Sequence, residues 1–133
     1  IQMLAQIAAH SGKQADTLEE LVNVMPKAVT SSWAVVLNNT DAGLERVAAS
    51  SAAPEDDGST PQMPAIEGAR ILQPDFDEWV PESWFQLDTA LTVAPLHGTD
   101  LVLVVGRVGG PDFLASEVRE VGDLGYIIGA ILR

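Results

Sequence analysis

Cysteine is absent from this sequence of 133 residues. Disulfide bonds, thiolate metal sites, iron–sulfur clusters, a cysteine nucleophile and a thioether-linked chromophore are therefore excluded. The fold must be stabilised by its own core, and a chain of this size buries roughly two thirds of the surface that the unfolded chain exposes. The absence of cysteine also suits the reducing cytoplasm, which is where we expect the protein to act.

Basic residues are few as well, since seven Lys and Arg stand against 19 Asp and Glu and give a net charge of −12. This charge would repel a phosphate backbone, and no basic patch interrupts it, so we expect no nucleic-acid binding. Long apolar runs are also missing: none approaches the ~20 residues that a membrane-spanning helix needs. We find no signal-peptide pattern and expect no membrane contact by this segment.

The first part of the sequence predicts two helices. Apolar side chains in residues 3–8 lie on one stripe of a short helix over residues 1–11. Thr17 and Glu20 have the spacing of a capping box and predict the start of a second helix. Pro26 lies within the apolar pattern of that helix and should kink or end it.

The middle of the sequence predicts a β-sheet. A hairpin comes first, then a mobile loop over residues 51–64, a short edge strand, and two strands joined by a tight turn. The run at Leu101–Val105 is apolar at every position, which is typical of a central strand covered on both faces. The predicted strands are Ser32–Asn39, Leu44–Ser50, a short piece within Ala65–Leu72, Ala90–Pro95 and Leu101–Val105.

The strand that ends at Pro95 has two unequal faces. Leu91 and Val93 point to one side, while the other side carries only small side chains. Small side chains on the inner face of a sheet leave volume that another side chain or a bound molecule must fill. The small residues are Ala90, Thr92 and Ala94.

Both ends of the sequence look cut from a longer protein, because it begins at Ile1 rather than Met and stops at Arg133 without a turn or tail. We interpret residues 1–133 as one excised domain. From about Ala115 apolar residues recur at helical spacing, and Ile127 and Ile131 make the stripe wider than one sheet face requires. That width predicts a second packing partner.

The order of these elements resembles that of a GAF domain over nearly the whole chain. The most specific features are the strand ending at Pro95-Leu96, the apolar strand ending near Gly106, and Phe113 placed four residues before the acid Glu117. The resemblance implies an α+β, PAS-related fold. It has a central antiparallel sheet of five or six strands, with the terminal helices packed on one face and a small-molecule pocket on the other.

The resemblance also implies a sensory role in signal transduction. Our first interpretation is a domain of a sensor histidine kinase, which binds a small molecule or relays packing changes to a helix beyond Arg133. One alternative is a non-sensing structural or dimerisation module whose pocket is filled by its own aromatic side chains, and another is the effector domain of a transcription regulator. The segment itself has no nucleophile elbow, phosphate loop or base–nucleophile pair, so we expect it not to be an enzyme.

No cofactor or ligand is identified by the sequence. The Asn-Lys-x-x-Phe-Asp-Glu motif of cyclic-nucleotide-binding GAF domains is absent, and the lack of cysteine disfavours bilin-attaching photoreceptors and free methionine sulfoxide reductases. His10 and His97 have no partner at metal-ligand spacing. The acidic runs Glu55–Asp57 and Asp75–Glu78 lack the rest of a calcium loop, so we interpret both as solvated loops.

Aromatic residues are scarce, yet four of the seven lie within ten residues, in the segment that by resemblance covers the pocket. These rings could form a lid over a ligand, or they could simply fill the space opposite the small residues of the strand that ends at Pro95. The candidate ligand-binding residues are Phe76, Trp79, Trp84, Phe85, Ala90, Thr92 and Ala94.

The apolar surfaces of the terminal helices predict a homodimer that forms a parallel helix bundle. The alternative is that these side chains pack only within the chain. The candidate interface residues are Met3, Leu4, Ile7, Leu124, Ile127, Ile128 and Ile131.

Overall fold

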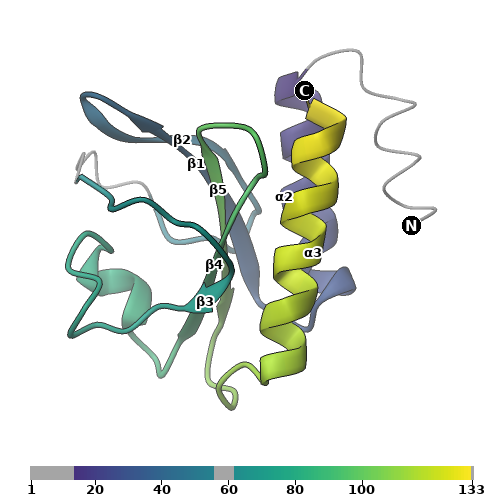
Figure 1. Ribbon diagram of the computed structural model, residues 1–133. Coiled ribbons are helices and arrows are strands. Elements are labelled where there is room, and N and C mark those ends of the chain that lie inside the picture. Colours follow the sequence, from purple (N-terminus) through teal and green to yellow (C-terminus); the bar gives the residue numbers. More distant parts are fainter. Residues whose placement is uncertain (1–13, 56–61, 133) are drawn as a thin grey trace.

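The computed structural model describes residues 14–55 and 62–132 (Figure 1). The helix predicted over residues 1–11 and residues 56–61 of the predicted loop lie outside the described residues. The elements are helix α2 (Gln14–Ala28), strands β1 (Trp33–Thr40), β2 (Gly43–Ala49) and β3 (Arg70–Ile71), the 3-10 helix η1 (Glu82–Phe85), strands β4 (Ala90–Pro95) and β5 (Leu101–Arg107), and helix α3 (Ala115–Leu132).

The strands form one antiparallel sheet in the order β2-β1-β5-β4-β3. β5 lies in the centre, and all of its residues are buried, as the continuous apolar run predicted. β1 and β2 form the predicted hairpin, in which Gly43 adopts a positive φ of 117°. The short edge strand predicted within Ala65–Leu72 is β3, which pairs with β4.

Helices α2 and α3 lie side by side on one face of the sheet (Figure 1). α2 packs on β1 and β2, and α3 packs on β4. Between them and the sheet lies a core that we call the helix-side core, to which α2 contributes Leu21 and Met25, and α3 contributes Val121 and Ile128. This arrangement confirms the predicted α+β fold with helices on one face. Among the described residues, no helix is both long and apolar enough to cross a bilayer.

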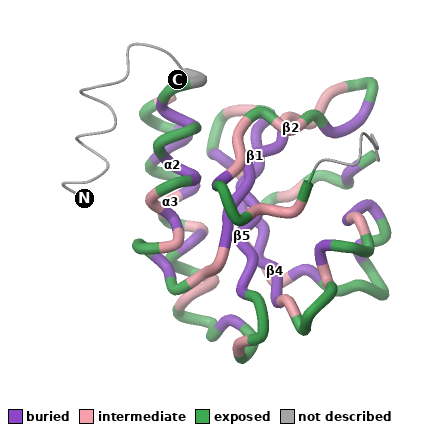
Figure 2. The backbone as a smooth tube through the Cα atoms, turned by 180° about the vertical axis from the view of Figure 1, so that it is seen from behind, coloured by how far each residue is buried: buried purple, intermediate pink, exposed green. Residues whose placement is uncertain are grey.

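The opposite face of the sheet is covered by the segment between β2 and β4, so buried residues run through the sheet with a layer on each side (Figure 2). The side chains on this face form a second cluster, which we call the aromatic core because it contains Trp33, Trp79 and Trp84. They pack with Leu91 and Val93 of β4. The chain thus has two cores that share one sheet.

The start of α2 differs from the prediction. The helix begins at Gln14, so Thr17 lies inside it and is buried, and the predicted capping box at Thr17 and Glu20 is wrong. Pro26 is inside the helix, two residues before its end at Ala28. Proline has no N–H to donate to the carbonyl four residues before it, and the helix ends two residues after Pro26, as predicted.

Candidate functional site

Strand β4 faces a different element on each side. Ala90 and Ala94 belong to the helix-side core, whereas Leu91 and Val93 belong to the aromatic core. By the alternation of a strand, Thr92 points to the helix side, and it is fully buried. The prediction that the aromatic rings lie opposite the small side chains of β4 is therefore wrong, because the sheet separates the two sets.

The small side chains of β4 make room for the backbone of α3. A Cβ atom at Gly125 would lie 2.5 Å from the carbonyl oxygen of Pro95 and 3.5 Å from the Cβ of Ala94. A Cβ at Gly129 would lie 2.2 Å from the carbonyl oxygen of His97. The His97 N–H also donates a hydrogen bond to the Gly125 carbonyl, at 3.3 Å. The volume beside Ala94 is thus filled by the helix backbone.

Two of the predicted site residues, Trp79 and Trp84, are core side chains, with 7% and 5% of their surface exposed. The ring of Trp84 meets that of Trp33 edge to face, with centroids 5.6 Å apart and planes at 77°. The guanidinium of Arg46 lies 5.7 Å from the centroid of the Trp84 ring. Trp33, which the sequence did not single out, completes this cluster.

The two phenylalanines of the segment have different environments. Phe85 is partly buried against the aromatic core, but 85% of the surface of Phe76 is exposed. The structure therefore brings Trp79, Trp84 and Phe85 together and places Phe76 outside the cluster.

Asp77 joins the stretch Phe76–Phe85, which we call the aromatic segment, to the edge of the sheet. Its carboxylate is 3% exposed and accepts two hydrogen bonds from Arg70 of β3, at 3.0 and 2.7 Å. It also accepts from the Gln73 N–H at 2.7 Å and from Trp79 Nε1 at 3.3 Å. The bonds from Arg70 lower the pKa of Asp77, although burial acts in the opposite direction. The interpretation of Asp77 as part of a solvated loop is wrong. The sequence signal that could have indicated this ion pair is Arg70, because basic residues are few in this acidic chain.

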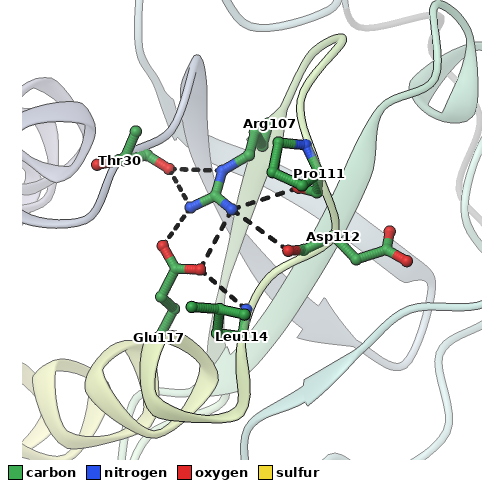
Figure 3. Close-up of polar contacts among 6 residues, drawn as sticks. All are labelled: Thr30, Arg107, Pro111, Asp112, Leu114 and Glu117. Atoms are coloured by element: carbon green, nitrogen blue, oxygen red, sulfur yellow. Dashed lines mark hydrogen bonds and ion pairs between the residues drawn. The ribbon is translucent and has the colours of Figure 1, made fainter.

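A second ion pair, between Arg107 and Glu117, lies where α2 ends and α3 begins (Figure 3). Arg107 is 8% exposed, and its guanidinium forms a two-pronged contact with the carboxylate of Glu117. It also donates to the carbonyl of Thr30, with Nε at 2.9 Å, and to that of Pro111, at 3.3 Å. Arg107 thus connects the end of β5 to the loop after α2 and to the first turn of α3.

Glu117 completes this connection by accepting a hydrogen bond from the Leu114 N–H at 2.9 Å, just before the start of α3. Hydrogen bonds from Arg107 and Leu114 lower the pKa of Glu117. The guanidinium of Arg107 also lies 4.3 Å from the centroid of the Phe113 ring. Phe113 and Glu117, two of the residues on which the resemblance to GAF domains rests, thus both contact Arg107. The sequence analysis did not predict these contacts, because it assigned no role to Arg107.

Side chains that could hold a metal are not gathered in the part of the chain that the structure describes. His97 is exposed and stacks on Tyr126, with ring centroids 4.3 Å apart, and His10 lies outside the described residues. Within residues 14–55 and 62–132, no three His, Asp or Glu side chains are arranged to hold a metal ion. A hollow of about 520 Å³ lies between α3 and the β3–β4 edge, beside His97 and Tyr126.

The predicted interface residues of α3 also divide into two groups. Ile128 is fully buried in the helix-side core and presents no surface to a partner. Leu124 is partly buried against the same core. Ile127 and Ile131 are each 38% exposed. Met3, Leu4 and Ile7 lie outside the described residues.

No family model matches the sequence, and no curated protein matches it. Solved structures match it over nearly its whole length. One is a GAF domain/HD domain protein from Geobacter sulfurreducens, at 13% identity and a TM-score of 0.66, covering 97% of this chain and 95% of that one. Another is the GAF domain of a candidate sensor histidine kinase from Pseudomonas syringae pv. tomato, at 15% identity and a TM-score of 0.62, covering 98% and 83%.

A third similar structure is the chromophore-binding domain of a bacteriophytochrome from Stigmatella aurantiaca in the Pr state, at 13% identity and a TM-score of 0.66. The match covers 98% of this chain and 58% of that one. At such low identity the likeness is one of fold, and it agrees with the sheet order and the placement of both helices. This chain therefore has the fold of a GAF domain, as its sequence predicted.

Proposed function

We propose that this chain is a sensory or regulatory domain of a signalling protein, and that its output leaves through α3. Solved structures with this fold include the GAF domain of a candidate sensor histidine kinase and the chromophore-binding domain of a bacteriophytochrome, which supports the proposal. The observation that carries this proposal is the close packing of Gly125 and Gly129 of α3 against the backbone at and just after the end of β4. A helix packed so closely moves when the strand moves.

Strand β4 is the proposed transmitting element, because it is buried on both faces. Leu91 and Val93 contact the aromatic core, and Ala90 and Ala94 contact the helix-side core. Protein interiors are packed as densely as organic crystals, so a displacement on one face is passed on rather than absorbed. A change in packing beneath the aromatic segment would in this way shift α3 and bias an output domain.

The proposed trigger is a small molecule, or a change of packing, at the aromatic segment, where Trp79, Trp84 and Phe85 lie together. The proposed whole protein is a cytoplasmic sensor histidine kinase, and a transcription regulator would use the same fold. A second candidate function is a non-sensing structural module. The burial of Trp79 and Trp84 favours it, because rings that fill the face need no ligand.

Tryptophan emission separates these two functions, because all three tryptophans of the chain belong to the aromatic core. Native mass spectrometry of the purified domain would first reveal any retained small molecule, and that molecule would then be removed and titrated back. Sensing predicts an emission change on titration, which Trp84→Phe should reduce while the helical signal in circular dichroism stays constant. If the domain retains no small molecule, and its tryptophan emission does not change when metabolites are added, the result would support the structural module.

We also propose that the domain forms a homodimer through its terminal helices. Ile127 and Ile131 lie one helical turn apart on α3 and are each 38% exposed, and Tyr126 beside them is 57% exposed. Replacing both isoleucines by Glu should convert dimer to monomer in native mass spectrometry. Ser116→Glu, at an exposed position on the same helix, should leave the dimer intact. A monomeric wild-type protein would refute this proposal.

A further inference from the structure

Phe76 is the most exposed large apolar side chain among the described residues, with 85% of its surface open to solvent. Its neighbours in the chain behave in the opposite way, because Asp77, Trp79 and Val80 are all buried. Folding thus buries three of the four residues that follow Phe76 and leaves the ring itself in water. An exposed phenylalanine contributes nothing to the core, so the core does not explain why this position is aromatic.

The backbone that carries Phe76 is held in place by a dense set of hydrogen bonds. The N–H groups of Phe76 and Asp77 both donate to the Gln73 carbonyl, at 3.1 and 2.8 Å. The Asp77 carboxylate accepts a hydrogen bond from the Gln73 N–H at 2.7 Å and two more from Arg70. The Val80 N–H then donates to the Asp77 carbonyl at 3.0 Å. The turn is therefore already ordered before anything contacts the ring.

The surroundings of Phe76 carry charge of one sign. Asp75 and Glu78 flank it and are exposed, and neither pairs with a cation within the described residues. Residues 73–89 contain no Lys or Arg at all. The nearest basic residue along the chain, Arg70, is already occupied by Asp77. The ring therefore stands on a turn whose free charges are negative.

We propose that Phe76 is the anchor of a docking surface for a protein partner, one that offers an apolar socket rimmed by lysine or arginine. An aromatic ring on a pre-ordered turn can enter a socket at low entropic cost, which is how single aromatic residues dominate interfaces. The flanking carboxylates select a basic rim and speed the encounter. A second copy of this chain does not fit the description, because the chain has only seven basic residues. A surface centred on one exposed ring suits a transient partner.

The first test uses a dye-labelled synthetic helical peptide with leucines on one face and lysines on the other, followed by fluorescence anisotropy. Phe76→Ser should weaken binding by about tenfold or more. The matched control is Leu114→Ser, which removes another exposed apolar side chain, a leucine that is 65% exposed and lies just before α3. The control should bind like wild type. Both variants should keep the wild-type melting temperature, because neither side chain is buried.

The charge requirement has its own comparison. The double variant Asp75→Asn, Glu78→Gln should weaken binding and reduce its salt dependence. Removing two exposed acids elsewhere, with Glu45→Gln and Glu120→Gln, should change binding less. Equal losses from the two pairs would show attraction to net charge alone and overturn the proposal.

Two further results would also overturn it. One is unchanged peptide binding by Phe76→Ser. The other is binding of the wild-type domain, but not of Phe76→Ser, to neutral phosphatidylcholine vesicles, which would assign the ring to a lipid surface.

Discussion

The hydroxyl of Thr92 offers a sharp test of the packing between the sheet and α3. Thr92 lies in the middle of β4 and is fully buried, and its Oγ1 has no hydrogen-bond partner among the described residues. A buried hydroxyl without a partner has lost its hydrogen bonds to water and gained none in return. Thr92→Val keeps the shape and the β-branched side chain while removing that hydroxyl, so we expect the variant to be more stable than wild type.

The size of the effect follows from the cost of burying an unpaired hydroxyl, about 1–3 kcal/mol in mutational data. A methyl group in the same place adds apolar burial of about 0.8 kcal/mol. The two contributions together raise the expected free energy of unfolding by about 2–4 kcal/mol. For a domain of this size each kcal/mol shifts the melting temperature by roughly 3–6 °C.

The matched control is Thr99→Val, in the turn between β4 and β5. There the hydroxyl donates to the Leu96 carbonyl at 2.7 Å and accepts from the Leu101 N–H at 3.0 Å. The same chemical change should destabilise at this position by about 1–3 kcal/mol, because two hydrogen bonds are lost. Urea denaturation of both variants measures the difference. A loss of stability in Thr92→Val would refute the reasoning and show that the hydroxyl is paired in solution, for instance with a ligand.

Three other perturbations test the two cores and the Arg107 ion pair. Trp84→Ala should cost about 3–5 kcal/mol in urea denaturation, because the ring is core, and a loss below about 1 kcal/mol would mean that it is a lid. Gly129→Ala should destabilise by about 1–3 kcal/mol in thermal melts, because its Cβ would overlap the backbone of His97, and a neutral result would show that α3 sits farther from β4. The lowered pKa of Glu117 means that its charged form stabilises the fold above the ordinary carboxyl pKa of about 4.3, and that this stability is lost as pH falls through the lower folded value. Glu117→Gln should therefore be less stable than wild type at pH 7, and its free energy of unfolding should fall less as the pH is lowered. An unchanged dependence of stability on pH would show that Glu117 does not contribute to it.

The two ion pairs suggest how the parts of the domain are held at fixed distances. Arg70 and Asp77 join the edge strand to the segment over the aromatic core. Arg107 and Glu117 join the central strand to the start of α3. Each pair is formed by an arginine on a strand and an acid beyond it in the chain. Each pair therefore joins a strand to an element that lies on one face of the sheet, the segment over the aromatic core in one case and α3 in the other.

The sequence by itself determined the elements and much of their order. The unbroken apolar run at Leu101–Val105 predicts a strand with no solvent face, and β5 is the central strand. The apolar spacing after Ala115 predicts α3, which starts at that residue. These predictions succeed because the repeat of a helix or a strand is set by the local backbone geometry. The start of α2 was missed, because Thr17 and Glu20 fit a cap by spacing alone.

Only the tertiary structure decided which elements pack against each face of a strand or helix. The alternation along β4 shows that Leu91 and Ala90 point apart, but nothing local states which side receives α3. The exposure of Phe76 likewise depends on a turn built around Asp77. The pairing of Arg107 with the Thr30 carbonyl joins residues far apart in the chain, so no short window contains it. Local periodicity therefore fixed the strands and helices, and long-range packing fixed the partners of their faces.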